Sequence, residues 1–311
     1  MLQWILSVFN GNNVKGAEKL KKKSNFSGQI GFVLAAAGSA VGVGNLWRFP
    51  YLVARDGGGL FLIIYLVLVL TFGFTLLTTD ISIGRKTGQS AIKAYETMRP
   101  GWNKLGFLTF MVPVLIMTYY AVIGGWILKY FIVFLTGASG DAAKDSYFTS
   151  FITNTSSVWF GLIFMLVTAL IVYNGVEGGI ERCSKFIMPV LLIMVVGIAI
   201  FSLTLRSKGA DGVVRTGLDG LKVYLMPDVS GLTVSRFLQV TLDAMSQLFF
   251  SLSVSMGIMI TYGSYVKKDV DLNKSVAQIE VVDTAVAFLA GVMIIPAIYV
   301  FSGMDGMSAG P

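Results

Sequence analysis

Long apolar runs alternate with short polar segments along this 311-residue chain. Each run holds about 20 residues or more, which is the length that a helix needs to cross the hydrocarbon core of a bilayer. A membrane barrel would instead show segments of about 10 residues in which apolar and polar positions alternate. The pattern therefore predicts an all-α polytopic membrane protein. We expect about seven transmembrane helices, at Gly28–Tyr51, Gly57–Thr79, Leu105–Leu128, Ser146–Val176, Phe186–Leu205, Ala244–Val266 and Thr284–Met304.

Charge indicates how these helices are oriented. Only 13% of the residues are charged, whereas a soluble domain carries about a quarter. Basic residues precede the first span and follow the second, fourth and sixth, so these loops lie on one side, which the positive-inside rule assigns to the cytoplasm. The loop between spans five and six is also basic, although three aspartates partly offset it. We expect a multi-pass protein of the cell (plasma) membrane, with residues 1–24 forming a cytoplasmic N-terminal extension that lies on the membrane surface or is disordered.

Several kinds of chemistry are excluded by composition. The chain has no histidine and a single cysteine, Cys183, so it offers no intrachain disulfide, no histidine acid–base catalysis and no zinc site of histidine and cysteine. No nucleophile–base pair and no interleaving of basic with aromatic residues is evident. We therefore expect neither an enzyme nor a nucleic-acid-binding protein.

Two spans are interrupted by weak helix formers. The first contains GSAVGVGN (residues 38–45), and the sixth contains SLSVSMG (residues 251–257). Small residues can mark close helix packing. They can also mark discontinuous helices, whose unwound backbone offers carbonyls to cations and N–H groups to anions. Asn45 favours discontinuous helices, because an amide at mid-membrane depth needs a polar partner.

Other polar residues within the spans allow two interpretations each. Tyr119 and Tyr120 are either ordinary buried tyrosines or ligand contacts. Asp80 either approaches the membrane interface or braces a neighbouring helix end. Arg48 is too deep for a casual surface charge and suggests a gate or anchor. Asp283 is either a helix-start acid or a cation ligand.

The chain strongly resembles the neurotransmitter:sodium symporter family, especially its prokaryotic amino-acid transporters. The resemblance rests on NFSGQIGFVLAAAGSAVGVGNLWRFPYL with the following DGGGLFLIIYL, on DISIGR, TYY and GVEGGIERCSKFIMP, and on SQLFFSLSVSMGIMITYGSYV and the LAG of span seven. These motifs occur in order across residues 25–303. They imply a leucine-transporter-type inverted-repeat bundle in which the first and sixth helices are discontinuous.

The resemblance also implies a domain organisation. Residues 25–303 match a transmembrane transporter domain as far as its seventh helix, and residues 304–311 match the start of an extracellular loop. Because the family carries further spans beyond this point, we expect the sequence to be C-terminally incomplete.

The family binds two sodium ions. By resemblance the first site takes the Ala40 carbonyl, the Asn45 side chain, the Ser251 hydroxyl and Asp283, all of them hard oxygen donors. The second takes the carbonyls of Gly38 and Val41 and is incomplete in this chain, because its other ligands belong to the family's eighth helix. An acid at position 283, in place of a neutral Asn, would reduce any need for chloride.

The resemblance also identifies a substrate site and two gates. Gly42 replaces the aspartate of monoamine carriers, which favours an amino acid that brings its own carboxylate. Backbone N–H groups and a tyrosine hydroxyl would bind that carboxylate, and carbonyls and hydroxyls of the sixth span would bind the ammonium group. The substrate residues implied are Ala40, Val43, Gly44, Ile116, Tyr120, Phe250, Ser251, Ser253 and Met256, and the gate residues implied are Arg48, Gln247, Phe250 and Tyr265.

These features predict a sodium-coupled symporter that imports a neutral, hydrophobic or aromatic amino acid by alternating access. Its partners would be the amino acid, sodium ions and the lipid bilayer. The alternative is a membrane protein that does not transport, either an amino-acid sensor or an inactive fragment of a transporter.

Overall fold

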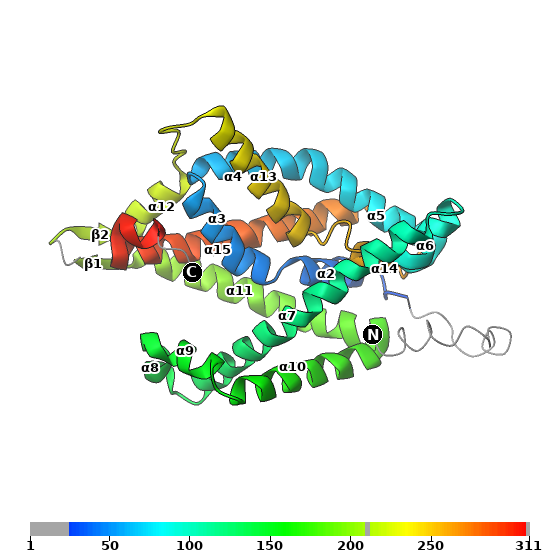
Figure 1. The fold of residues 1–311 in the computed structure, drawn as a ribbon, viewed down its shortest axis with the longest axis horizontal. Coiled ribbons are helices and arrows are strands. Elements are labelled where there is room, and N and C mark those ends of the chain that lie inside the picture. Colours follow the sequence, from blue (N-terminus) through cyan, green and yellow to red (C-terminus); the bar gives the residue numbers. More distant parts are fainter. Residues whose placement is uncertain (1–24, 209–211, 309–311) are drawn as a thin grey trace.

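The computed structural model describes residues 25–208 and 212–308, and the predicted extension at residues 1–24 lies outside the described residues. The described chain is a bundle of helices (Figure 1), as predicted. It also contains one short antiparallel hairpin that was not predicted, in which β1 (Arg206–Lys208) pairs with β2 (Val214–Thr216) after the fifth span.

Within the described residues, five helical stretches are long and apolar enough to cross a membrane, and a bent pair of helices makes a sixth candidate span. The second span is α4 (Gly59–Leu68), the π-helical turn η2 (Val69–Gly73) and α5 (Phe74–Thr87). The others are α7 (Asn103–Leu135), α10 (Ser156–Tyr173), η3 (Val176–Glu181) with α11 (Arg182–Thr204), and α15 (Leu272–Ser308), in which Gly303 leaves the helical conformation.

The bent pair is the first span. It consists of α2 (Gln29–Ala40) followed by η1 (Gly44–Arg48) and α3 (Phe49–Arg55), and its two halves meet at an angle of 51°. The predicted sixth span is likewise divided, into α13 (Val234–Ser251) and α14 (Ile258–Gly263). Neither half is both long and apolar enough to cross a membrane alone. Of the seven predicted spans, six are thus candidates by length and composition within the described residues, and the sixth predicted span is not among them. The first and sixth predicted helices are both discontinuous, as the resemblance implied.

Two predicted boundaries need correction. The predicted fourth span, 146–176, contains α9 (Asp145–Ile152) and only then α10, because Asn154 accepts a hydrogen bond from Ser156 N at 2.9 Å in a turn that separates them. The sixth span begins ten residues earlier than predicted, at Val234, where Thr233 caps the helix by accepting from Arg236 N. The remaining short helices are α6 (Ala91–Met98), α8 (Ser139–Ala142) and α12 (Gly217–Leu225).

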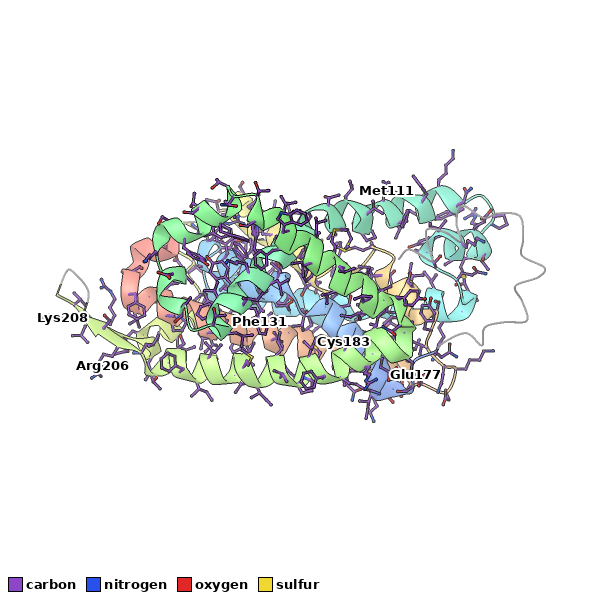
Figure 2. The ribbon with its side chains drawn as sticks, turned by 90° about the horizontal axis from the view of Figure 1, so that it is seen from below. Met111, Phe131, Glu177, Cys183, Arg206 and Lys208 are labelled. Atoms are coloured by element: carbon purple, nitrogen blue, oxygen red, sulfur yellow. The ribbon has the colours of Figure 1, made fainter. Side chains whose placement is uncertain are left out.

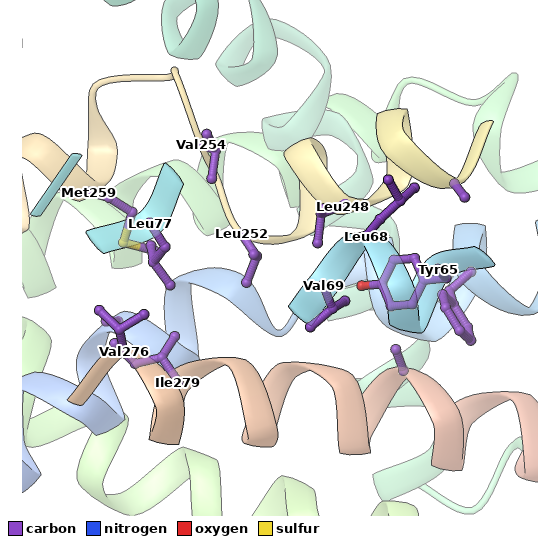
Figure 3. Close-up of a cluster of buried hydrophobic side chains, with 14 of the residues drawn as sticks. Tyr65, Leu68, Val69, Leu77, Leu248, Leu252, Val254, Met259, Val276 and Ile279 are labelled. Atoms are coloured by element: carbon purple, nitrogen blue, oxygen red, sulfur yellow. The ribbon is translucent and has the colours of Figure 1, made fainter. Parts of the chain in front are cut away.

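The core lies where the second, sixth and seventh spans meet. Figure 3 shows Leu77 of α5, Leu248 of α13 and Ile279 of α15 converging on it, and all three side chains are fully buried. The first span packs along α15. This packing places the interruptions of the first and sixth spans beside each other near the centre of the bundle.

Helices α7 and α10 pack against each other along one side of the bundle (Figures 1 and 2). No residue of α10 is buried, and its exposed side chains include Leu162, Leu166 and Leu170. An apolar surface of this extent fits contact with lipid rather than with water.

Candidate functional site where two broken helices meet

The first helix breaks after Ala40 because its hydrogen-bond ladder is diverted. Gly42 N, which would continue the ladder, donates instead to Asn45 Oδ1 at 3.2 Å, and Asn45 N donates back to Gly42 O at 3.1 Å. The last carbonyl groups of α2 therefore lie outside the regular hydrogen-bond pattern between residues i and i+4 of a helix. The predicted cation ligands Gly38, Ala40 and Val41 are at this helix end.

The sixth helix breaks between Ser251 and Ile258. Ser253 and Ser255 adopt positive φ angles of 53° and 60°, which residues with a side chain rarely do. Ser255 N donates to the buried carboxylate of Asp80 at 3.0 Å, so α5 braces the unwound segment. This contact agrees with the bracing interpretation of Asp80. Strained backbone conformations such as these positive φ angles persist only where the surrounding structure holds them, and they are frequent at functional sites.

The two breaks are joined directly. Gln247 Nε2 donates to Gly44 O at 3.1 Å. A methyl group placed on Gly44 would lie 3.0 Å from the Phe250 ring, so the close approach of the first helix to the sixth suits a residue without a side chain.

Three side chains distant in sequence form a buried polar cluster here. Asn45 Nδ2 donates to Asp283 Oδ1 at 2.8 Å and to Asp283 O at 3.1 Å. The Ser251 hydroxyl lies 2.8 Å from Asp283 Oδ1 and 3.3 Å from Asn45 Oδ1. Asn45 and Asp283 are 0% and 1% exposed. The structure thus brings together the three side chains predicted as ligands of the first sodium ion.

The donor chemistry of the cluster fits a hard cation. Asp283 Oδ2 and Gln247 Oε1 are both buried, and neither has a hydrogen-bond partner. A buried carboxylate is costly unless an opposite charge or a hydrogen bond compensates it. Carboxylate, amide and hydroxyl oxygens are ligands that hard cations prefer. The described residues contain no group of three or more His, Cys, Asp or Glu side chains that could hold a metal ion.

A cavity of about 880 Å³ lies next to the cluster. Of the predicted substrate residues, Val43, Gly44, Tyr120, Phe250 and Met256 line it. The rings of Tyr120 and Phe250 lie 6.3 Å apart. The other predicted substrate residues, Ala40, Ile116, Ser251 and Ser253, are not in its lining, and three of these four are buried in the packing around the breaks.

The cavity also has walls that the sequence analysis missed. Their spacing was the available signal, since positions 44, 47, 48 and 51, and positions 242, 245, 246 and 249, follow the i, i+3, i+4, i+7 pattern of one helix face. Tyr119, which the sequence left as either a buried tyrosine or a ligand contact, is part of this lining. The missed lining residues are Trp47, Tyr51, Ile123, Leu242, Met245, Ser246 and Phe249.

The predicted gate residues lie at different levels of the bundle. The Arg48 guanidinium donates to Ser246 Oγ at 2.9 Å and stands 5.6 Å from the centre of the Phe250 ring, at the cavity. Gln247 faces the backbone of the first helix instead of Arg48. Tyr265 lies at the opposite end of α2, where its carbonyl accepts from Phe26 N at 3.2 Å.

A second polar cluster, also missed from sequence, closes that opposite end. Glu181 is 1% exposed and accepts from Ser27 N at 2.9 Å, from the Ser27 hydroxyl, and from Lys185 Nζ at 2.6 Å. Lys267 Nζ donates to Ser27 O at 3.0 Å. The starts of the first and fifth spans and the end of the sixth are therefore tied together on the side of the predicted cytoplasmic loops.

These features define a polytopic membrane protein in which two broken helices enclose a buried polar site. Residues 23–156 and 142–307 match the family model of the sodium:neurotransmitter symporter family. The chain belongs to this family, which consists of sodium-coupled transporters and not of enzymes. The family predicted from the sequence is confirmed.

Individual relatives support the same conclusion. The chain is 35% identical over 287 residues to the uncharacterized sodium-dependent transporter YhdH of Bacillus subtilis, covering 90% of this chain and 61% of the relative. It is 30% identical over 301 residues to the sodium-dependent neutral amino acid transporter B(0)AT3 of Rattus norvegicus, covering 88% and 47%.

The crystal structure of MhsT in complex with L-phenylalanine superposes with a TM-score of 0.80 at 36% identity, covering 93% of this chain and 64% of MhsT. The predicted leucine-transporter-type bundle is confirmed by this match. The chain thus spans less than two thirds of the length of these relatives.

Proposed function

We propose that this protein takes part in sodium-coupled symport of a neutral, hydrophobic or aromatic amino acid across the cell membrane by alternating access. The observation that carries the proposal is the buried cluster of Asn45, Ser251 and Asp283 at the meeting point of the two broken helices. A bound sodium ion would supply the positive charge that the unpaired Asp283 Oδ2 lacks.

The cavity supports the proposed substrate class. Its walls are mostly aromatic and aliphatic, which suits an apolar side chain, and MhsT was crystallised with L-phenylalanine. The amino acid's carboxylate would lie against the N–H groups near Val43 and Gly44 and the Tyr120 hydroxyl. A carboxylate that shares the first sodium ion there would make ion binding and substrate binding depend on each other.

Carbonyls near Phe250 and Ser251, together with the Ser253 hydroxyl, would accept the substrate's ammonium group. Ile116 and Met256 would contact its side chain. The carbonyls of Gly38 and Val41 would contribute to a second sodium site.

Alternating access would use the contacts at the two ends of the first span. Arg48 with Ser246 and Phe250 would close the site on one side, and Tyr265 with Phe26 would close it on the other, which we propose is the cytoplasmic side. The membrane potential would drive sodium entry with about 2.3 kcal/mol per charge per 100 mV.

The proposal is tested with the purified chain and labelled L-phenylalanine. We expect binding that requires sodium, and uptake into proteoliposomes that stops when the sodium gradient is removed. Binding without uptake would favour the alternative, a membrane sensor of amino acids. Binding that is the same in sodium and in choline would contradict the assigned cation site.

A further inference from the structure

A second buried acid lies one helical turn before the proposed cation ligand. Glu280 of α15 is 7% exposed, and its Oε1 has no hydrogen-bond partner. Within the described part of the chain, no ion pair reaches this side chain either. A mid-span carboxyl without a partner is unusual in a membrane protein and marks a functional position.

The surroundings of Glu280 are apolar. A methyl group placed on Gly73, in the π-helical turn η2, would lie 2.7 Å from Glu280 Oε1 and within 3.4 Å of Leu248 and Leu252. The carboxyl group therefore points into the space between the second helix and the break of the sixth (Figure 3 shows Leu248, Leu252 and the neighbouring Ile279).

Two titratable groups lie near Glu280, and neither can supply a positive charge. They are the carboxyl of Asp283 on the same helix and the buried hydroxyl of Tyr65 on α4. Gly73, Leu248 and Leu252 contribute no charge from η2 and the end of the sixth helix's first half. A carboxylate at this position would be an uncompensated charge beside a second one, whereas a protonated carboxyl would be neutral.

Glu280 lies between the proposed sodium site and one end of the bundle. At about 1.5 Å per residue, Glu280 lies about 12 Å along the axis from the start of α15 and about 4.5 Å before Asp283. It therefore stands between the proposed sodium site and the end of the bundle that Tyr265 and Lys267 close.

We propose that Glu280 is a proton-binding site, which holds a proton in this closed conformation and releases it to water when the cytoplasmic half of the bundle opens. The proton leaves the carboxyl oxygen for a water molecule, and the carboxylate that remains is then hydrated. The link to transport rests on the proposed function, but the protonation itself does not.

Infrared spectroscopy tests the protonation directly, because the C=O stretch of a carboxylic acid is separate from that of a carboxylate. With the purified full chain at neutral pH, we expect a carboxylic-acid band that disappears in Glu280→Gln. Asp243→Asn is the matched control, because Asp243 is ion-paired with Arg55 and its removal should leave the band unchanged. An identical band in wild type and Glu280→Gln would overturn the proposal.

Folding of the variants provides a second test. Because the residue is neutral in this conformation, Glu280→Gln and Glu280→Leu should both give monodisperse protein with a melting temperature at or above that of wild type at neutral pH. Loss of folding in both variants would show that the fold requires a charge at this position, and would overturn the proposal.

A transport measurement then tests the link to the cycle. Sodium-driven uptake should vary with cytoplasmic pH in wild type and lose that variation in Glu280→Gln, and an unchanged pH profile would refute the link. Absence of sodium-dependent uptake in wild type would refute the proposed function, while the infrared result would still decide the protonation of Glu280.

Discussion

Asn45 has both ends of its amide engaged. Its oxygen accepts from Gly42 N and lies 3.3 Å from Ser251 Oγ, while its nitrogen donates to Asp283. It therefore stabilises the break of the first helix and orients two proposed ligands on other helices. One residue at this position controls both local backbone geometry and the arrangement of the site.

Asn45→Ala should weaken sodium and substrate binding together. The substitution removes the acceptor of Gly42 N and the amide donor to Asp283 Oδ1, while Ser251 and Asp283 keep their own contact. A buried polar group left without its partner costs about 1–3 kcal/mol. Binding of labelled L-phenylalanine over a range of sodium concentrations measures this effect. Asn174→Ala is the control, because the Asn174 side chain donates only within its own exposed helix end, to Leu170 O. Unchanged substrate affinity that still depends on sodium would contradict the assignment.

Gly31→Ala should destabilise the closed end of the first helix. A methyl group there would lie 2.0 Å from Glu181 Oε1, so Glu181 would have to leave Ser27 and Lys185. Hydrogen bonds to charged groups are worth about 1.5–3 kcal/mol. Thermal unfolding measures the loss, and Gly28→Ala serves as the control because nothing lies within 4 Å of its added methyl group. Equal melting temperatures of the two variants would argue against a role for the Glu181 contacts.

At the scale of elements, the two broken helices are held by different means. A side chain within the first helix closes its own break, through Asn45. The second break depends on another element, because Asp80 of α5 accepts from Ser255 N. The sixth span should therefore respond to changes in the second.

Asp80→Ala should loosen the unwound segment at residues 252–257. Without the carboxylate, Ser255 N loses its acceptor and the positive φ angles of Ser253 and Ser255 lose a support. Hydrogen exchange of a peptide covering the segment should become faster. The neighbouring Thr79→Ala is the control, because the Thr79 hydroxyl donates only to Thr75 O in its own helix. Equal exchange in the two variants would show that α5 does not brace the break.

Helix α12 should depend on acidity at its start. Thr216 and Asp219 form a capping box, in which Thr216 Oγ1 accepts from Asp219 N and Asp219 Oδ2 accepts from Thr216 N, both at 3.2 Å. Asp219 Oδ2 also accepts from the Thr216 hydroxyl at 2.6 Å. This bond is the main reason that the pKa of Asp219 is lowered. A lowered pKa stabilises the fold above the usual aspartate pKa of about 4, and the stabilisation is lost as pH falls through the folded-state value. Asp219→Asn should thus lower the melting temperature at pH 7 and have less effect near pH 3, and a difference independent of pH would contradict this account.

At the scale of the whole molecule, the proposed site joins the first, sixth and seventh spans, and a bound ion would connect them. A ligand that binds only the folded state raises stability, by about 2.7 kcal/mol at a concentration 100 times its dissociation constant. Replacing choline with sodium should therefore raise the melting temperature of wild type. Asp283→Ala should abolish this rise. If the variant kept the full rise, the cation would have to bind at another site.

The spans could be predicted because hydrocarbon imposes a length on every helix that crosses it. The errors fell where polar residues decide the boundary, at Asn154 before α10 and at Thr233 before α13. The resemblance supplied Asn45, Ser251 and Asp283 as a set. It did not supply Glu181, Ser246 or Glu280, whose surroundings are created by other helices.

The sequence by itself determined that this is a helical membrane protein of the sodium:neurotransmitter symporter family, and that its first and sixth helices are interrupted. Glycines, serines and an asparagine within apolar runs are local features, and their effect on a helix is local. Only the tertiary structure decided which polar groups meet, because Asn45 and Asp283 are 238 positions apart and bond only once their helices pack together. The same packing left oxygens of Asp283 and Glu280 without partners, one facing the proposed sodium site and the other an apolar space.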